Sequence, residues 1–355
     1  MKPSRGLNAM ATGNSYDLVT AALERYKSLT MQTLLAYLPS REPKRYLYDL
    51  VPSYPQRSGK GFRPGLCIST CGAFGGNAEL ALNSAVAIEI VHNAFLIHDD
   101  VEDGSEYRRG KATMHVEHGI PIAVNVGDAM NVLSMRPLME NIGVLGPELT
   151  WMVFSEIEHM VRQSVEGQAM ELGWVRDNVC DLGEEDYLRM TLKKTCWYTC
   201  IHPCRIGALI ATAGTVDADR FNRFGYYMGA AFQIQDDILN LTGDRKKYGK
   251  EIGGDIWEGK RTLMLIHLLN RCTEGEKERM RRFLATPRPQ RLRKDVRWVY
   301  RLLAKYDCIE SARRSAYQLA GAALREYHVA YRGLPDSDDK RFIENVIFYM
   351  IERNI

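Results

Sequence analysis

The sequence contains no run of about eighteen apolar residues, the minimum expected of a helix that crosses a membrane, so we predict no membrane span. Its formal net charge of +3 over 355 residues is too small to indicate a nucleic-acid-binding protein. Its eight cysteines lack the paired spacing of a disulfide framework, which indicates a reducing, cytoplasmic setting. The N-terminus lacks the apolar segment of a signal peptide, and residues 1–14 are predicted to form a disordered tail.

Alternating patterns of β-branched residues, typical of strands, are also nearly absent. Apolar residues instead recur every three to four positions along most of the chain, which is the period of an amphipathic helix. Neither a repeat nor a linker divides the chain. We therefore predict an all-α fold, with residues 15–355 forming one large helix bundle around a central cavity. The basic stretch 287–301 is interpreted as a loop that leads into a solvated helix face.

The first unusual feature is a cluster of acidic residues at the end of an apolar helical run, in the segment "FLIHDDVEDGSEYRRG". On a helix, Glu89, His92, Asp99, Asp100 and Asp103 fall within an arc of about 100°. Carboxylates at positions i, i+1 and i+4 form an all-oxygen anionic patch of the kind that suits Mg²⁺. Taken alone, the cluster is equally compatible with a solvated helix end whose acids pair with the two arginines that follow.

A second acidic stripe, in "FQIQDDILNLTGD", makes the solvated alternative much less attractive. Gln233, Asp236, Asp237 and Asn240 lie at i, i+3, i+4 and i+7, again on an otherwise apolar helix. Two acidic stripes inside a bundle are stable only if cations compensate them. Together they could clamp several Mg²⁺ ions around a diphosphate. Basic groups that could bind the same diphosphate occur at Lys60, Arg63, Arg108, Arg109, Lys194, Lys250 and Lys260.

In the order of these motifs, the chain resembles the trans-isoprenyl diphosphate synthases of the polyprenyl synthetase family. The resemblance runs from about Lys60 to the C-terminus. Its motifs are Gly59-Lys60-x-x-Arg63-Pro64, Asp99-Asp100-x-x-Asp103, Arg108-Arg109-Gly110, Gly167-Gln168, Lys194-Thr195, Gln233-x-x-Asp236-Asp237-x-x-Asn240, Gly249-Lys250 and Asp255-x-x-Glu258-Gly259-Lys260.

The resemblance implies an Mg²⁺-dependent condensation of isopentenyl diphosphate with an allylic diphosphate of C5, C10 or C15. It implies about three Mg²⁺ ions per active site, held by carboxylates and diphosphate oxygens. The implied metal ligands are Asp99, Asp103 and Asp236, supported by Asp100 and Asp237. The implied allylic diphosphate contacts are Arg108, Lys194, Lys250 and Lys260. The implied isopentenyl diphosphate contacts are Lys60, Arg63, His92 and Arg109, and Gln168 belongs to the substrate-binding set. Lys194, Thr195, Gln233 and Lys250 are the implied catalytic residues. The family also implies a homodimer.

Two details of the sequence bear on this assignment. The glutamine motif of the family usually reads G-Q-x-x-D, whereas this chain carries Glu171, so the carboxylate is retained on a longer side chain. In this family the bulk just before the first aspartate motif sets the product length. Phe95 lies one turn before Asp99 and could form the floor under the growing chain, beside the small Ala94. We expect a C20 product, with C15 as the next candidate, although Phe95 could simply be a core residue.

Cys196, Cys200 and Cys204 lie four residues apart beside His202, in "CWYTCIHPC". Their spacing matches no common zinc site, and we interpret them as small, buried packing residues. A related spacing in non-catalytic subunits of the family mediates heterodimer contacts, so an interface role stays open.

Two other functions are compatible with parts of the pattern. A class I terpene cyclase shares the first aspartate motif, but its second motif reads N-D-x-x-S-x-x-x-E instead of Asp236-Asp237-x-x-Asn240. A cyclase also has no need of Lys60, Arg63 and Arg109 for a second diphosphate. A non-catalytic regulatory subunit of a synthase would lose aspartates from one or both motifs, and none is lost here.

Overall fold

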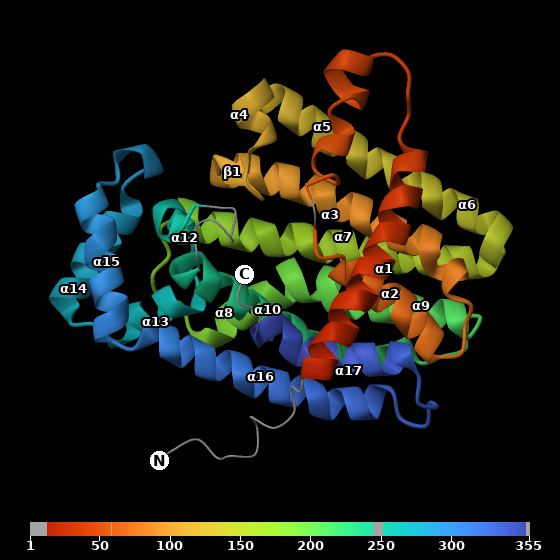
Figure 1. Cartoon of the computed structure of the whole chain (residues 1–355). Coiled ribbons are helices and arrows are strands. Elements are labelled where there is room, and N and C mark those ends of the chain that lie inside the picture. Colours follow the sequence, from red (N-terminus) through yellow and green to blue (C-terminus); the bar gives the residue numbers. More distant parts are fainter. Residues whose placement is uncertain (1–12, 58, 244–250, 353–355) are drawn as a thin grey trace.

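Helices form most of the computed structural model, which describes residues 13–57, 59–243 and 251–352 (Figure 1). The predicted all-α class is confirmed. The N-terminal tail predicted for residues 1–14 lies outside the described residues up to position 12, and α1 begins at Gly13. The only strands in the described part of the chain are β1 (Tyr107–Arg108) and β2 (Lys111–Ala112), which pair antiparallel.

The helices follow in this order. They are α1 (Gly13–Tyr37), η1 (Lys44–Tyr48), η2 (Val51–Ser53), α2 (Phe62–Ala73), η3 (Ala78–Ala81), α3 (Leu82–Asp103), α4 (Met114–His118), α5 (Ile120–Leu133), α6 (Met135–Leu145), α7 (Pro147–Arg176), α8 (Glu184–Thr191), η4 (Leu192–Ile201), α9 (His202–Ala211), η5 (Ala218–Phe221), α10 (Asn222–Thr242), α12 (Gly254–Glu258), α13 (Leu263–Arg271), α14 (Glu274–Ala285), η6 (Arg288–Gln290), α15 (Arg293–Lys305), α16 (Cys308–Ala330) and α17 (Asp338–Glu352).

The helix that carries the first aspartate motif, α3, is apolar on nearly all sides before it reaches that motif. Such a helix belongs in the middle of a bundle, and residues 84–94 of α3 are all buried. The 26-residue span Ala78–Asp103 is long and apolar enough to cross a membrane by length and composition alone, which our sequence prediction did not anticipate. Its most apolar window is 78% buried inside the bundle, as in the core helix of a globular domain.

Neighbouring helices approach one another closely because small residues lie at the crossings. A side chain on Gly229 of α10 would collide with Cys196 of η4, and one on Gly207 of α9 would collide with the backbone of α2 at Cys67. The cysteines Cys196, Cys200 and Cys204 are unpaired and fully buried, and burial raises the pKa of each thiol. Their predicted burial is confirmed.

Two apolar clusters make up the largest part of the core. One joins α2, α9, α10, α16 and α17 through residues such as Phe224 and Ile343, and the other joins α10 with α13, α15 and α16. Leu319 of α16 packs against both clusters. Figure 1 shows that α13, α14 and α15 gather at one end of the bundle, beside α12. This arrangement brings the α12 segment to the ends of α3 and α10, where the two aspartate motifs lie.

Candidate active site

A cavity of about 720 Å³ extends between α3, α7, η4 and α10. It brings together fourteen of the predicted site residues, from seven separate sequence segments. These are Lys60, Arg63, His92, Phe95, Asp99, Arg108, Arg109, Gln168, Lys194, Thr195, Gln233, Asp236, Asp237 and Lys260. Asp103 lines a neighbouring cavity of about 580 Å³ that shares Glu102, Glu171 and Lys260 with the first. Lys250 lies outside the described residues.

The first aspartate motif places its carboxylates in different surroundings. Asp99 lies in the cavity wall, where one oxygen is 3.1 Å from Nη2 of Arg108 and the other 3.5 Å from Nζ of Lys194. Asp100 is fully buried behind it and accepts hydrogen bonds from Nε of Arg108 at 2.8 Å and from the hydroxyl of Tyr54 at 2.6 Å. Because both Asp100 oxygens are occupied and face away from the cavity, this residue orients Arg108 instead of facing a ligand.

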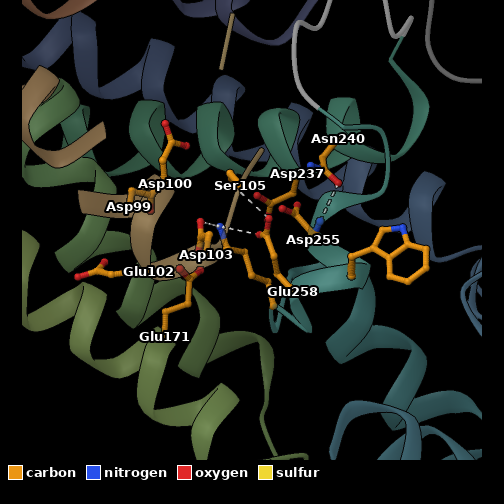
Figure 2. A network of polar contacts seen from close by, with 12 residues as sticks. Asp99, Asp100, Glu102, Asp103, Ser105, Glu171, Asp237, Asn240, Asp255 and Glu258 are labelled. Atoms are coloured by element: carbon orange, nitrogen blue, oxygen red, sulfur yellow. Dashed lines mark hydrogen bonds and ion pairs between the residues drawn. The ribbon is translucent and has the colours of Figure 1, made fainter. Parts of the chain in front are cut away.

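Asp103, at the last turn of α3, is held by a lysine from the other end of the site. Nζ of Lys260 lies 2.6 Å from Oδ2 of Asp103 and 3.3 Å from Oε2 of Glu258. Figure 2 shows Asp103, Glu171, Asp237, Asp255 and Glu258 turned toward one another from α3, α7, α10 and α12. Burial, and then the nearby charge of Asp99, raise the pKa of Asp103 to about 7. Lys260 therefore does not fully offset the cost of burying this charge, and a further cation would stabilise the ionised form of Asp103.

The second aspartate motif is ordered by neutral hydrogen bonds. Oδ1 of Asp237 accepts from Nε2 of Gln233 at 2.8 Å, and Oδ2 accepts from the Tyr187 hydroxyl at 2.8 Å. Thr195 donates to Oε1 of Gln233 at 2.9 Å, which fixes the orientation of that amide. Burial raises the pKa of Asp237 to about 6, despite these bonds. Asp236 lines the same cavity beside them.

Asn240, the last residue of the second motif, has a structural role. Its side-chain oxygen accepts from the backbone N–H of Asp255 at 3.2 Å, and its main-chain oxygen accepts from Gly253 at 2.7 Å. Gly253 and Gly259 have φ values of +77° and +74°, in the left-handed region that favours glycine. Asn240 therefore fastens the segment that carries Lys260 to α10, which the sequence pattern did not reveal.

The opposite part of the cavity is rich in positive charge. Nη1 of Arg63 lies 3.2 Å from Nε2 of His92, and Nη2 donates to Thr199 at 2.9 Å. Burial, and then Arg63, lower the pKa of His92 well below its usual value, so this imidazole is neutral and accepts at Nε2. Arg109 adopts a left-handed backbone with φ of +52°. Such strain at a non-glycine residue is typical of functional sites. This cluster suits a second anionic group.

Lys194 and Thr195 lie on η4, a π-helical segment. The wider turn of a π-helix changes the register of the side chains and is frequent at functional sites. Lys194 pairs with Glu171 of α7 and with Asp99 of α3. Burial opposes its charge, but Glu171 and Asp99 raise the pKa of Lys194 above its usual value. Glu171, the departure from the family motif, is therefore a partner of this lysine. Gln168 lies on α7, as does Glu171, and its Nε2 donates to Glu102 at 2.5 Å.

The two residues predicted to set the product length lie on different faces of α3. Phe95 lines the cavity and contacts Tyr198 edge-on, with ring centroids 5.9 Å apart. Ala94 is fully buried in the cluster that α3 forms with α5, together with Ile90 and Val126. Ala94, predicted together with Phe95 to set the product length, therefore lies on the core face and does not line the cavity, because one step along a helix rotates a side chain by about 100°.

Several residues that organise the site were not recognised from the sequence. Tyr54 and Tyr187 hold the buried aspartates Asp100 and Asp237 from distant segments. Glu258 was part of a motif, but no role was assigned to it. The exposed helix face predicted for the basic stretch is confirmed at α15, whereas Arg288 of the same stretch faces inward and binds Glu258 at 3.1 Å.

The donor set of the cavity fits a hard divalent cation that retains part of its hydration. Among the described residues, no group of three or more His, Cys, Asp and Glu side chains lies close enough to hold a metal by itself. Asp99 and Asp236 nevertheless line one cavity from opposite helices with oxygen ligands only. Mg²⁺ typically binds through one or two carboxylates, waters and substrate phosphates. The carboxylates fit Mg²⁺ that arrives with a diphosphate.

Comparison with known proteins gives consistent results. The family model for polyprenyl synthetase matches residues 44–303. The geranylgeranyl diphosphate synthase of Saccharolobus solfataricus is 36% identical over 62% of this chain, and the match covers 65% of that relative, slightly under two thirds of its length. The geranylgeranyl pyrophosphate synthase of Geoglobus acetivorans is 29% identical over 95% of this chain and 100% of its own. The crystal structure of geranylgeranyl pyrophosphate synthetase from Pyrococcus horikoshii superposes with a TM-score of 0.83 at 30% identity, covering 96% of this chain and 99% of that one.

Proposed function

Because the chain belongs to the polyprenyl synthetase family, we propose that it joins isopentenyl diphosphate to an allylic diphosphate, producing a short all-trans prenyl diphosphate. The accepted allylic substrates are those of C5, C10 and C15. We favour a C20 product, in keeping with the geranylgeranyl diphosphate synthases among its relatives, and C15 as the next candidate. The observation that carries the proposal is one cavity with two charged ends, an acidic end at Asp99 and Asp236 and a basic end at Arg63 and Arg109.

The acidic end would hold the allylic diphosphate. Asp99, Asp103 and Asp236 would bind Mg²⁺, in about three ions as the family pattern implies, with Asp100 and Asp237 in supporting positions. Bound there, Mg²⁺ would supply positive charge to the departing diphosphate. The side chains that would share this task are Arg108, Lys194, Lys250 and Lys260. Negative charge grows on the diphosphate as the allylic C–O bond breaks, so these cations stabilise the transition state more than the bound substrate.

The basic end would hold isopentenyl diphosphate through Lys60, Arg63, His92 and Arg109. The diphosphate of the allylic substrate leaves with the electron pair of the C–O bond. The double bond of isopentenyl diphosphate then attacks C1 of the resulting allylic cation. A new C–C bond forms, and loss of one proton to the departed diphosphate creates the new double bond. The neutral dipoles of Thr195 and Gln233 face this centre, and Phe95 and Tyr198 shield the cation from water.

The active form is proposed to be a homodimer in the cytoplasm. An apolar surface on α5, α6 and α7 supports the dimer, because monomers rarely expose so many large apolar side chains together. Trp151 is 69% exposed and stacks on Phe154 with ring centroids 5.8 Å apart. The other exposed members are Val124, Val132, Met135, Met139, Ile142, Val144, Met152 and Val165. The eight free cysteines are in keeping with a reducing compartment.

Product analysis tests the proposal. Purified protein with Mg²⁺, labelled isopentenyl diphosphate and, separately, each allylic diphosphate should give a ladder of linear alcohols after dephosphorylation, ending at C20. A hydrocarbon released from the allylic substrate alone, without consumption of isopentenyl diphosphate, would indicate a terpene cyclase. Activity that appears only when a second synthase chain is added would indicate a regulatory subunit. Either result would overturn the proposed function.

A further inference from the structure

Arg288, in the short η6 turn between α14 and α15, reaches back to the acidic end of the cavity. Nη1 donates to the main-chain oxygen of Asp103 at 2.7 Å and to Oε1 of Glu258 at 3.1 Å. Nη2 donates to Oε2 of Glu251 at 3.0 Å. One guanidinium therefore joins the end of α3 to two points on the segment that carries α12. Arginine suits such a junction because its planar fork presents several donors in fixed directions.

Glu258 connects Arg288 with the lysine of the site. Its Oε1 is bound by Arg288, whereas its Oε2 lies 3.3 Å from Nζ of Lys260. Nζ of Lys260 in turn lies 2.6 Å from Oδ2 of Asp103. The four residues therefore form a closed ring of contacts, part of which appears in Figure 2. The side chain of Glu258 is only 10% exposed, so a lost partner would leave a largely desolvated charge.

The turn that carries Arg288 is itself firmly held. Arg291, three residues later, is buried and donates to main-chain oxygens of Thr286 at 2.9 Å and Trp257 at 2.6 Å. A side chain on Gly259 would collide with the Arg291 guanidinium. The backbone of the α12 segment is thus packed directly against this turn. The backbone that carries Arg288 is therefore held in place by these contacts of Arg291.

We propose that Arg288 is a positioning residue that sets the place of Lys260 through Glu258 and fixes the last turn of α3. Arg288 does not line the main cavity; it lines the neighbouring one, so it acts through other residues and not on substrate. When a cation or diphosphate engages Asp103, Lys260 retains Glu258 as its second partner. Arg288 is the charged partner that holds Oε1 of Glu258 at 3.1 Å, whereas the Ser105 hydroxyl approaches the same oxygen only at 3.4 Å. The expected effect on allylic substrate rests on the proposed function, whereas the expected effect on local structure does not.

The test compares Arg288→Ala and Arg288→Lys with Arg297→Ala, a control on the exposed face of α15 in the same basic stretch. Hydrogen exchange of the substrate-free protein is measured on peptides covering residues 251–260, with α16 as reference. In Arg288→Ala we expect exchange at 251–260 to become at least about tenfold faster, because the amides of Gly253 and Lys260 lose the support that keeps them bonded. The α16 peptides and the control should match the wild type.

Kinetics give the second measurement. Arg288→Ala should lower kcat/KM for the allylic diphosphate about tenfold, mostly through KM, with less than twofold change in KM for isopentenyl diphosphate. Arg288→Lys should recover part of the loss. Glu258→Gln should cause a similar loss, and Arg288→Ala combined with Glu258→Gln should be no worse than either alone, because both act through one ring.

Unchanged exchange at 251–260 in Arg288→Ala, or additive losses in the double variant, would overturn the proposal. If Arg288→Ala does not fold, Arg288→Lys and Glu258→Gln carry the same test. If the wild type shows no condensation at all, the proposed function fails, and the exchange experiment still decides the structural role of Arg288.

Discussion

Gly167 of α7 lies directly against the backbone of Lys194 on η4. A Cβ atom at position 167 would overlap the backbone nitrogen and Cα of Lys194, so the two helices can approach this closely only with glycine there. Because the neighbour is backbone and not a flexible side chain, it cannot move aside cheaply. The position of Lys194 and Thr195 in the cavity depends on this contact.

Gly167→Ala should therefore displace η4. We expect a loss of stability of about 1–3 kcal/mol, as is typical of overpacking, and at least a tenfold loss of kcat. Gly173→Ala is a matched control on the same helix, because a Cβ there meets no atom within 4 Å. That control should keep full activity and gain up to about 1 kcal/mol from better helix propensity. Denaturant unfolding and steady-state kinetics measure both effects. Equal behaviour of the two variants would contradict the role of the close contact.

Asp237 should make the stability of the metal-free protein depend on pH. Its pKa is raised to about 6 in the folded chain, against about 3.9 in an unfolded one. A carboxyl with a raised folded pKa contributes stability that is fully present below the unfolded pKa and is lost as pH rises through the folded pKa. Asp237→Asn removes this loss. The free energy of unfolding of the variant, minus that of the wild type, should therefore increase by up to about 3 kcal/mol between pH 4 and pH 7.

Urea denaturation in EDTA at several pH values measures this difference, and other groups that titrate cancel between the two proteins. Asp181→Asn makes the same substitution at an exposed position and is the control for the substitution itself. A difference between Asp237→Asn and wild type that does not change with pH would mean that Asp237 is not desolvated as the structure indicates.

Much of the fold and of the site followed from the sequence because both depend on local spacing. The apolar period of three to four residues predicted the helices, and the acidic stripes predicted which helix faces meet in the cavity. Phe95 was placed correctly because it lies four residues before Asp99. Ala94 was grouped with Phe95, although its spacing to Ile90 and Ile97 puts it on the core face.

Other features arise only from tertiary packing. Tyr54 reaches Asp100 across 46 residues of sequence, and no pattern marks that tyrosine as a partner of a buried acid. The π-helical register at η4 depends on how closely α7 and α10 press against it. Arg288 looked like one more solvated cation in a basic stretch, because its acceptors Asp103 and Glu258 become neighbours only after folding.

Removal of a carboxylate from the acidic end should weaken metal-dependent diphosphate binding. In the wild type, Mg²⁺ with inorganic diphosphate should raise the unfolding temperature, because ligands that bind only the folded state stabilise it. Asp99→Asn should reduce this rise by more than half and lower kcat at least about 100-fold. Asp128→Asn, an exposed position near His98, should behave like wild type. A full rise in Asp99→Asn would show that Asp99 is not a metal ligand.

Phe95 should control the length of the product. Its ring lines the cavity one turn before Asp99 and packs edge-on against Tyr198, which lines the same cavity. Phe95→Ala should open space for further isoprene units, so the product ladder should extend beyond the wild-type length, and Phe95→Leu should shift it less. Ala94→Val is the matched control on the core face; it should cost about 1–3 kcal/mol of stability through overpacking and leave the ladder unchanged. Chromatography of the dephosphorylated products decides the matter. A ladder that changes in Ala94→Val but not in Phe95→Ala would place the floor of the cavity on the other face of α3.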